Sequence, residues 1–577
     1  MVKKLLNSVR EYKKPSLLSP LFITLEVIME VIIPLLMARL IDLGIDGGDM
    51  SYILKIGFAL VLSAIISLFF GALAGKYAAN ASAGFAKNLR QDMYYNVQKY
   101  SFSNIDKFST ASIVTRLTTD VTNVQNAYQM IIRIAVRGPI MLTFSMIMAF
   151  SINAKLSLIF LFLIPILGIG LFLIISKAHP IFEHVFKVYD KLNNVVQENL
   201  RGIRVVKSFV RDEHENKKFE EISHDIYEDF TKAEKTVAYN MPLMQLCMYG
   251  CMLLISWFGA RLIVNSEMTT GELMSLFTYA MQILMSLMML SMVFVTIIIS
   301  RASAERIVEV LDEKSDIVNP ENPIFNVNDG AIDFKNVRFS YTKNKNKLCL
   351  KGINLNIKSG ETVGIIGGTG SSKTSLVQLI PRLYDATEGT ISVGGIDVKD
   401  YDIETLRNEV AMVLQKNELF SGTIKENLRW GNENASDEEI IRVCKLAQAD
   451  DFVSTFPDGY DTYIEQGGSN VSGGQKQRLC IARALLKKPK ILILDDSTSA
   501  VDTKTDSLIR SAFKSEIPNT TKIIIAQRIS SIEDADKIVV MNNGEIDAIG
   551  THEELLKSND IYKEVYSSQM KGGKVSE

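Results

Sequence analysis

A glycine-rich turn in the second half of the chain has the residue types and spacing needed to bind phosphate groups. It follows an apolar strand expected over 362–366 and opens a helix expected over 375–383. The turn and the first helical residue are Gly367, Gly368, Thr369, Gly370, Ser371, Ser372, Lys373, Thr374 and Ser375. Backbone N–H groups at a helix start bind phosphate oxygens, Lys373 offsets their charge, and the Thr374 hydroxyl suits Mg²⁺. The pattern therefore predicts a phosphate-binding loop.

One residue of this turn departs from the usual pattern. Ser372 stands where a glycine is expected before the lysine. If the backbone there needs a conformation that glycine tolerates more easily than other residues, Ser372 carries some strain.

Two carboxylates follow an apolar strand further along the chain. Residues 491–494 are Ile-Leu-Ile-Leu, and Asp495 and Asp496 come directly after them. A carboxylate at the end of such a strand holds Mg²⁺ through water, and a second one reaches the water that attacks a phosphate. We therefore expect Asp495 to serve a metal ion and Asp496 to activate water.

A second glycine pair lies just before another expected helix. The segment 471–475 contains Ser472, Gly473, Gly474 and Gln475. Its N–H groups are placed to receive a phosphate from the side opposite to the Lys373 loop. Taken alone, the segment leaves an ordinary tight turn open as the alternative.

Taken in order, these motifs over 331–570 resemble the nucleotide-binding domain of the ATP-binding-cassette (ABC) transporters. The resemblance also includes Tyr341 before the turn, Gln415 after Val413-Leu414, Asp502 in Ser499-Ala500-Val501-Asp502, and Gln527. Segments 115–121 and 198–207 are similar to the regions in which the family's exporters couple their membrane and ATPase domains.

The resemblance implies a role for each of these residues. Tyr341 is expected to stack on adenine, and Ser371 and Lys373 to hold the phosphates of ATP. Thr374, Gln415 and Asp495 are expected to organise Mg²⁺ and water. Because such domains dimerise head to tail, Ser472 and Gly474 are expected to contact the γ-phosphate of a nucleotide bound mainly by the other half.

Two residues depart from the family's pattern in a way that bears on catalysis. The family's catalytic glutamate is Asp496 here, and its switch histidine is Gln527. Aspartate is one methylene shorter, so its oxygens fall roughly an ångström short of the attacking water, which can cost ~10²-fold in rate. Gln527 can hydrogen-bond a phosphate but carries no positive charge. The alternative, that both are tolerated variants of a working site, stays open.

The elements that must position these residues change in character near residue 300. Six apolar stretches precede that point, each near or above the ~20 residues that cross a bilayer. They cover 17–42, 52–76, 134–152, 155–176, 241–264 and 271–299. The connections 77–133 and 177–240 are long, polar and helical in spacing, so we expect the helices to continue out of the membrane on the cytoplasmic side.

The second part of the chain reads as alternating strands and helices, which predicts an α/β domain with a largely parallel sheet. Together with the resemblance to ABC transporters, this implies the fold class of an α-helical six-span membrane domain fused to an α/β P-loop ATPase domain, the ABC exporter fold. The expected domains are 1–312 for the membrane domain, 313–330 for a linker, 331–570 for the nucleotide-binding domain and 571–577 for a tail.

Two carboxylates inside the first apolar stretch call for a partner. Glu26 and Glu30 lie one helical turn apart, and ionisable residues at that depth are costly. They either face a central cavity and favour cationic cargo, or pair with Arg133 or Arg137 from the third stretch.

Composition limits the remaining choices. The 577 residues are 47% apolar and 22% charged, which excludes a disordered or collagen-like chain. Lys plus Arg number 63 against 65 Asp plus Glu, so no basic excess indicates a nucleic-acid partner. Cys247 and Cys251 lie one turn apart in an apolar stretch and are expected to be small buried hydrophobes rather than a metal pair.

The function that these observations favour is one half of an ATP-driven multidrug exporter. We expect it to use ATP and Mg²⁺ and to move small amphipathic or drug-like compounds. We also expect it to lie in the plasma (inner) membrane with a cytoplasmic N-terminus, which is indicated by the basic residues Lys3, Lys4, Arg10, Lys13 and Lys14. The alternatives are export of lipids or peptides, or an ATP-gated membrane protein that does not pump. The impaired Asp496 and Gln527 predict a second, non-identical half as partner.

Overall fold

The N-terminal half consists of helices that are far longer than a bilayer requires. In the parts of the chain that this computed structural model describes, 1–497 and 501–573, six helical segments are long and apolar enough to cross a membrane. They are Arg10–Ile45, Met50–Gln98, Thr110–Ile152, Ala154–Ser208, Asp212–Val264 and Thr270–Asp312. The 55 residues of Ala154–Ser208 extend for roughly 80 Å, against a hydrocarbon core of about 30 Å. The six predicted spans are confirmed, and the helices continue well beyond the apolar stretches.

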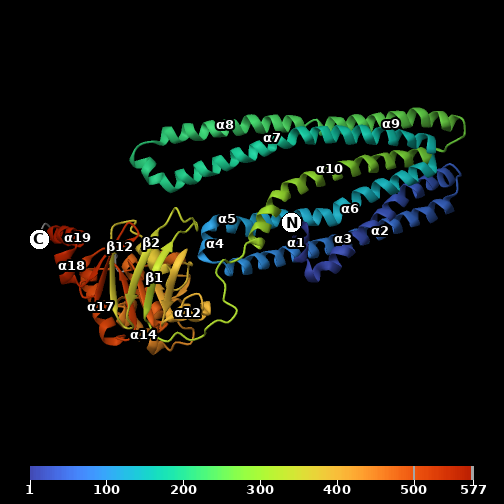
Figure 1. Cartoon of the computed structure of the whole chain (residues 1–577). Helices are drawn as coiled ribbons and strands as arrows, with labels where there is room; N and C mark the ends of the chain where they lie inside the picture. The colour runs from blue at the N-terminus through green and yellow to red at the C-terminus, as the bar shows by residue number, and fades with distance from the viewer. Residues whose placement is uncertain (498–500, 574–577) are drawn as a thin grey trace. The chain divides into compact units, whose positions relative to one another are not determined.

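The described residues form two compact units (Figure 1). One combines Met1–Gln98 with Ser109–Glu313, and the other combines Lys99–Phe108 with the chain from Lys314 onward. The helices of the first unit are α1 (Val2–Asn7), α2 (Lys13–Arg39), α3 (Met50–Gln98), α5 (Thr110–Thr115), α6 (Val121–Ile152), α7 (Ala154–Ser208), α8 (Asp212–Val237), α9 (Asn240–Val264) and α10 (Thr270–Asp312).

Helix α2 packs mainly against α3 and α6, and two hydroxyl groups of α10 also hydrogen-bond to its backbone. The Tyr279 hydroxyl donates to the Val31 carbonyl at 2.7 Å, and the Ser275 hydroxyl donates to the Pro34 carbonyl at 2.6 Å. Both bonds lie close to Pro34, which has no N–H and therefore interrupts the backbone hydrogen bonds of the helix. In a bilayer no water is available to bond exposed carbonyl groups near such an interruption. Cys247 and Cys251 are buried among apolar side chains, as the sequence predicts.

The intramembrane carboxylates form ion pairs with one arginine of α6. Arg137 Nη1 donates to Glu26 Oε1 at 2.5 Å, and Nη2 donates to Glu30 Oε2 at 2.7 Å. Gly71 of α3 leaves the room for this, because a Cβ there would lie 3.0 Å from Glu26 Oε1. The ion-pair alternative is confirmed for Arg137, since a buried charge is tolerated only when it is paired.

Helices α7 and α8 form a long hairpin (Figure 1). Val195, Ile222 and Ile226 are buried between the two helices. At the turn, Phe209 is 73% exposed and Val210 is 81% exposed, and Val210 has φ = 52°. A β-branched residue in the left-handed region is an outlier that marks a strained turn.

The second unit contains a mixed six-stranded sheet whose parallel strands are buried. Its strand order is β12 (Glu545–Gly550), β11 (Lys537–Asn542), β3 (Thr362–Gly367), β10 (Thr521–Ile525), β9 (Ile491–Asp495) and β6 (Val410–Val413). Strands β11, β3, β10, β9 and β6 are parallel, and β12 pairs antiparallel with β11. The carboxyl ends of β3, β9, β10 and β6 therefore meet at one edge, where ligands of open α/β sheets bind.

A second sheet and several helices complete this unit. The second sheet is antiparallel and consists of β2 (Leu350–Ile357), β1 (Ile332–Phe339), β4 (Glu388–Val393) and β5 (Ile396–Asp397). A short pair joins β7 (Gly422–Thr423) and β8 (Tyr463–Ile464). The helices are α4 (Phe102–Lys107), α11 (Lys373–Gln378), α12 (Ile403–Glu409), α13 (Ile424–Arg429), α14 (Asp437–Leu446), α15 (Asp450–Ser454), α16 (Gly473–Leu486), α17 (Thr503–Glu516), α18 (His552–Ser558) and α19 (Asp560–Gly573).

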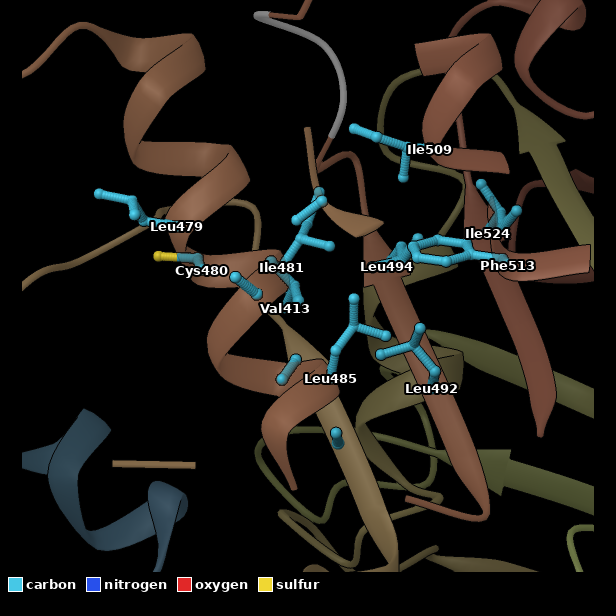
Figure 2. Close-up of a cluster of buried hydrophobic side chains, with 14 of the residues drawn as sticks. Val413, Leu479, Cys480, Ile481, Leu485, Leu492, Leu494, Ile509, Phe513 and Ile524 are labelled. Carbon is cyan, nitrogen blue, oxygen red and sulfur yellow. The ribbon is translucent and has the colours of Figure 1, made fainter. Parts of the chain in front are cut away.

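Helix α16 is fixed to the parallel sheet by a buried apolar cluster (Figure 2). Ile481 and Leu485 of α16 lie with Val413 of β6, and with Leu492 and Leu494 of β9. Burying side chains of this size stabilises the contact by roughly 1.5–3 kcal/mol each. The start of α16, which carries the second glycine pair, is thereby held in a fixed position on the second unit.

Candidate functional site

The glycine-rich turn lies at the carboxyl end of β3 and opens α11. The strand is buried along its centre because it pairs on both sides, with β11 and β10. Lys373 Nζ donates to the carbonyls of Gly367 at 2.8 Å and Gly368 at 2.9 Å, so its ammonium lies over the turn. Burial lowers the pKa of Lys373, while the carboxylates of Asp496 and Asp495 oppose that shift. The turn thus presents one cation at the position where phosphate charge is expected.

Ser372 has a left-handed backbone conformation, with φ = 69° and ψ = 27°. A residue with a Cβ pays roughly 1–2 kcal/mol there, because the Cβ approaches the following carbonyl oxygen. The sequence predicts backbone strain at Ser372 if its backbone is left-handed, and that strain is therefore present. Gly370, two residues earlier, has φ = 82°.

Asp495 ends β9 as a buried carboxylate with one oxygen left over. Thr374 Oγ1 donates to Asp495 Oδ1 at 3.1 Å, and the side chain of Asp495 is almost fully buried. Its Oδ2 is buried without a hydrogen-bond partner among the residues that the structure describes. Burial raises the pKa of Asp495, and the hydrogen bond from Thr374 opposes that shift. An unpaired buried carboxylate oxygen is costly, and a divalent cation is the partner that would satisfy it. Thr374 and Asp495 therefore fit a Mg²⁺ site.

The three residues predicted to be catalytic meet at one oxygen atom. Gln527 Nε2 donates to Asp496 Oδ2 at 2.6 Å, and Gln415 Nε2 donates to the same oxygen at 3.4 Å. They come together because β6, β9 and β10 are neighbours, and each residue follows the end of one of these strands. Asp496 itself has φ = 49°. Both of these donors are neutral amides, and the carboxylate of Asp496 also interacts electrostatically with the Lys373 ammonium.

Tyr341 lies beside the start of α11, as an aromatic residue that contacts the base would. Its hydroxyl is 2.8 Å from Ser375 Oγ, and it donates to Gln378 Oε1 at 3.3 Å. Its ring packs edge-on against Tyr384, with centroids 5.1 Å apart, and remains 42% exposed. Burial raises the pKa of Tyr341, so the phenol stays neutral.

Ser472 and Gln475 cap the N-terminus of α16 and each other. Ser472 Oγ accepts from the Gln475 N–H at 3.3 Å, and the Ser472 N–H donates to Gln475 Oε1 at 2.9 Å. Within the described ranges, no hydrogen bond joins these two residues to the 367–374 turn. The cap leaves the N–H groups of Gly473 and Gly474 directed out of the helix start, where an anion is favoured.

Some residues of the predicted motifs lie outside the part of the chain that the structure describes. Ser499 and Ala500 of the motif before Asp502 lie outside the described residues, as do the last four residues of the predicted tail. Asp502 caps α17 by accepting from the Thr505 N–H at 2.9 Å.

Gln569 of α19 is the main residue that the sequence gives no reason to select. It lines a cavity of about 480 Å³ together with Asp496, Gln527 and Arg528. Its side chain donates to the Gln527 carbonyl and accepts from the Ile529 N–H. No motif marks it, because the contact joins residues 42 positions apart.

Comparisons with known proteins agree on both halves of the chain. Residues 16–288 match the family model for the ABC transporter transmembrane region, and residues 350–499 match the model for the ABC transporter. The chain is 37% identical to YfiB of Bacillus subtilis, an uncharacterized ABC transporter ATP-binding protein, over 98% of each chain. It is 35% identical over 80% of each chain to an ATP-dependent lipid A-core flippase of Desulfotalea psychrophila.

Two further similarities concern exporters. Over 99% of each chain, it is 30% identical to YgaD of Bacillus subtilis, which is provisionally named a multidrug export ATP-binding/permease protein. The structure superposes on that of a bacterial Atm1-family ABC exporter with ATP bound, with a TM-score of 0.84 and 25% identity, covering 96% of this chain and 99% of the other.

Proposed function

This chain belongs to the ABC transporter family and is a multi-pass, ATP-hydrolysing exporter, and from that premise we propose that it is the catalytically impaired half of a heterodimer. The observation that carries the proposal is the hydrogen bond of 2.6 Å from Gln527 Nε2 to Asp496 Oδ2. A short carboxylate and a neutral amide occupy the positions of the family's catalytic glutamate and switch histidine. In a homodimer both ATP sites would contain this pair, and neither would hydrolyse ATP quickly.

The site built on Lys373 is proposed to bind ATP with Mg²⁺. Tyr341 would stack on adenine, Ser371 and Lys373 would hold the phosphates, and Thr374, Asp495 and Gln415 would hold Mg²⁺, which neutralises phosphate charge when bound. The unpaired Asp495 Oδ2 supports the metal assignment. ATP at this site would be held for long periods and hydrolysed slowly, because Asp496 is poorly placed and Gln527 carries no charge.

The start of α16 is proposed to complete the partner's site. Ser472 and Gly474 would approach the γ-phosphate bound by the other half, which supplies the glutamate and histidine that this chain lacks. Two observations support a second half. The α16 start makes no hydrogen bond to this chain's own turn in the described residues, and the apolar tip of α7 and α8 is exposed.

For cargo, we propose small amphipathic or drug-like compounds, moved out of the cytoplasm by alternating access. An open apolar groove of about 410 Å³ between α7 and α9, lined by Leu173, Leu243 and Leu246, supports a cargo with apolar parts. Lipid export is the second candidate, favoured by the similarity to a lipid A-core flippase. The basic N-terminal segment supports a plasma-membrane protein whose N-terminus and ATPase domain are cytoplasmic.

Steady-state ATPase of the co-purified pair tests the heterodimer. Asp496→Asn is expected to change turnover modestly, because this site contributes little hydrolysis. Ser472→Ala and Gly474→Asp are expected to reduce turnover severely, because they damage the partner's working site. Equal, severe losses in all three variants would instead indicate two working sites.

The chain without its partner supplies a converse test. Alone it is expected to hydrolyse ATP slowly, and the double variant Asp496→Glu with Gln527→His is expected to raise that rate, by up to ~10²-fold if placement of the base is the main defect. Rapid hydrolysis by the unaltered chain alone would rule out the heterodimer. Lys373→Ala is the control, since it should remove nucleotide binding in either background.

A further inference from the structure

The C-terminal helix α19 reaches the segment that follows β10 and contains Gln527. Gln569 Nε2 donates to the Gln527 carbonyl at 2.8 Å, and Gln569 Oε1 accepts from the Ile529 N–H at 2.9 Å. A single side-chain amide thus makes two hydrogen bonds to the backbone, one on each side of Arg528. Side chains of Arg528 and Gln569 also line the cavity that Asp496 and Gln527 border.

The position of Gln569 is fixed by the buried face of α19. Tyr562 is fully buried, and its hydroxyl lies 2.8 Å from His552 Nδ1. Val565 and Tyr566 pack against the apolar core of this unit. Gln569 follows Tyr562 by seven residues and Tyr566 by three, so all three lie on one face of the helix. The core thereby places the amide next to the backbone of residues 527–529.

The backbone at Gln527 is held from two sides. The N–H of the preceding residue, Ala526, donates to the Ile365 carbonyl at 3.2 Å, and the Gln527 carbonyl accepts from Gln569. The Gln527 side chain then reaches Asp496 Oδ2 at 2.6 Å. Further along, the Ser531 hydroxyl donates to Asp506 Oδ2 at 2.9 Å. Without Gln569, the backbone of Gln527 and Ile529 loses both of the hydrogen bonds that join it to α19 among the described residues.

We propose that Gln569 is a positioning residue for ATP: it fixes the backbone of Gln527 so that the Gln527 side chain meets the γ-phosphate and Asp496. The C-terminal helix is then part of the nucleotide site although it touches no nucleotide. This inference rests on the proposed role of Gln527 at the γ-phosphate, and the tests below separate the two.

The first test measures the affinity of the full-length chain in lipid nanodiscs for MgATP and MgADP by displacement of a fluorescent nucleotide. Gln569→Ala is expected to weaken MgATP binding by roughly 5- to 10-fold, the effect of about one lost hydrogen bond to the γ-phosphate. MgADP affinity is expected to stay the same, because ADP has no γ-phosphate. An equal loss for both nucleotides, or no loss for ATP, would overturn the positioning role.

Three further variants make the result specific. Ser568→Ala, on an exposed neighbour in α19, is expected to leave both affinities unchanged. Gln569→Glu keeps the helix propensity but cannot donate to the Gln527 carbonyl, so it should behave like Gln569→Ala. If Gln569→Glu binds ATP normally, the donated hydrogen bond is irrelevant and the proposal fails. Gln527→Ala should show the same ATP-selective loss, and the double variant with Gln569→Ala should add little to it.

Hydrogen exchange tests the backbone contact without nucleotide. Amide exchange in the peptide that contains Ile529 is expected to be at least about 5-fold faster in Gln569→Ala than in Ser568→Ala, because the Ile529 N–H loses its acceptor. Unchanged exchange would overturn the proposal even if Gln527→Ala has the expected effect. If exchange accelerates but Gln527→Ala binds ATP normally, the proposed role of Gln527 fails and with it the positioning role of Gln569.

Discussion

At the scale of single residues, the phosphate-binding turn contains backbone strain whose presence the sequence alone could not establish. Ser372 has a left-handed backbone where the family's pattern has glycine, and Gly370 has a similar backbone two residues before it. A Cβ built on Gly370 would meet no atom within 4 Å. The two positions therefore allow backbone strain to be separated from steric contact.

We predict that Ser372→Gly stabilises the protein and that Gly370→Ser destabilises it. Relief of about 1–2 kcal/mol of strain, less the greater freedom that glycine gives the unfolded chain, leaves a net gain of roughly 0.5–1 kcal/mol for Ser372→Gly. Gly370→Ser should lose a similar amount, because only its backbone conformation is unfavourable. Thermal unfolding of the full-length protein without nucleotide measures both, and a loss of stability in Ser372→Gly would contradict the prediction.

At the scale of elements, helix α4 is bound to the second unit by a small polar network and by aromatic contacts. Asp316 accepts from Ser103 Oγ and from Lys343 Nζ, both at 2.8 Å, and from the Ser101 hydroxyl that caps α4. Tyr384 donates to Asp106 Oδ2 at 2.7 Å, and its ring also packs on Tyr341. The same tyrosine thus contacts both α4 and the residue proposed to stack on adenine.

Asp316 makes the docking of α4 sensitive to acid. Burial opposes ionisation, but hydrogen bonds from Lys343, Ser101 and Ser103 prevail and lower the pKa of Asp316 from 3.8 to about 2. Because the folded-state pKa lies below the ordinary one, this stabilisation is complete above about pH 4 and is lost as pH falls toward about 2. Its size, discounted for the exposed Lys343, is on the order of 1–2 kcal/mol.

We predict that Asp316→Asn loosens α4 at neutral pH and removes its acid sensitivity. Amide exchange over 99–108 should be faster than in the unaltered protein at neutral pH. The difference should shrink as the pH falls toward about 2, because the Asp316 carboxylate of the unaltered protein then becomes protonated and uncharged, like the amide of the variant. Asp458→Asn, on an exposed aspartate of the same unit, is the matched control and should change nothing. Equal exchange rates in Asp316→Asn and the control would contradict the prediction.

The ion pairs between α2 and α6 also act at this scale. We predict that Glu26→Gln combined with Glu30→Gln lowers transport of cationic and neutral dyes equally and reduces the yield of folded protein. The reason is that Arg137 would be left as an unpaired buried charge, which typically costs about 3–5 kcal/mol. Adding Arg137→Gln to the double variant should restore much of the yield. A selective loss of cationic dyes at normal yield would instead favour the cavity-facing hypothesis.

At the scale of the whole molecule, the hairpin of α7 and α8 ends in an apolar surface that a second half would cover. Phe209 and Val210 are among the most exposed apolar residues of the described chain. Exposed apolar side chains at the tip of a long polar hairpin are typical of a docking surface.

We predict that Phe209→Asp with Val210→Asp uncouples cargo from ATP hydrolysis in the paired complex. Cargo-stimulated ATPase should fall by roughly 10-fold or more, as for loss of a central interface contact, while MgATP binding by this chain stays the same. Tyr227→Asp, on α8 and 66% exposed, is the matched control and should retain stimulation. Full stimulation in the tip variant would show that these residues contact nothing needed for coupling.

The sequence by itself determined the features that depend on local composition and short spacing. Six apolar stretches fix six spans, because each must satisfy its backbone inside the bilayer on its own. The Gly367–Thr374 turn between a buried strand and a helix likewise carries its chemistry in consecutive residues. For the same reason, the substitutions at Asp496 and Gln527 are visible without a structure.

Only the tertiary structure decided which distant residues meet. The pairing of Glu26 and Glu30 with Arg137 rather than Arg133 depends on how α2 and α6 pack and on the room that Gly71 leaves. The left-handed backbone of Ser372 depends on how the turn closes between β3 and α11. Gln569 meets the backbone of Gln527 only because the core places α19 against the segment after β10. Contacts of this kind are set by packing over the whole domain, so no local pattern marks them in advance.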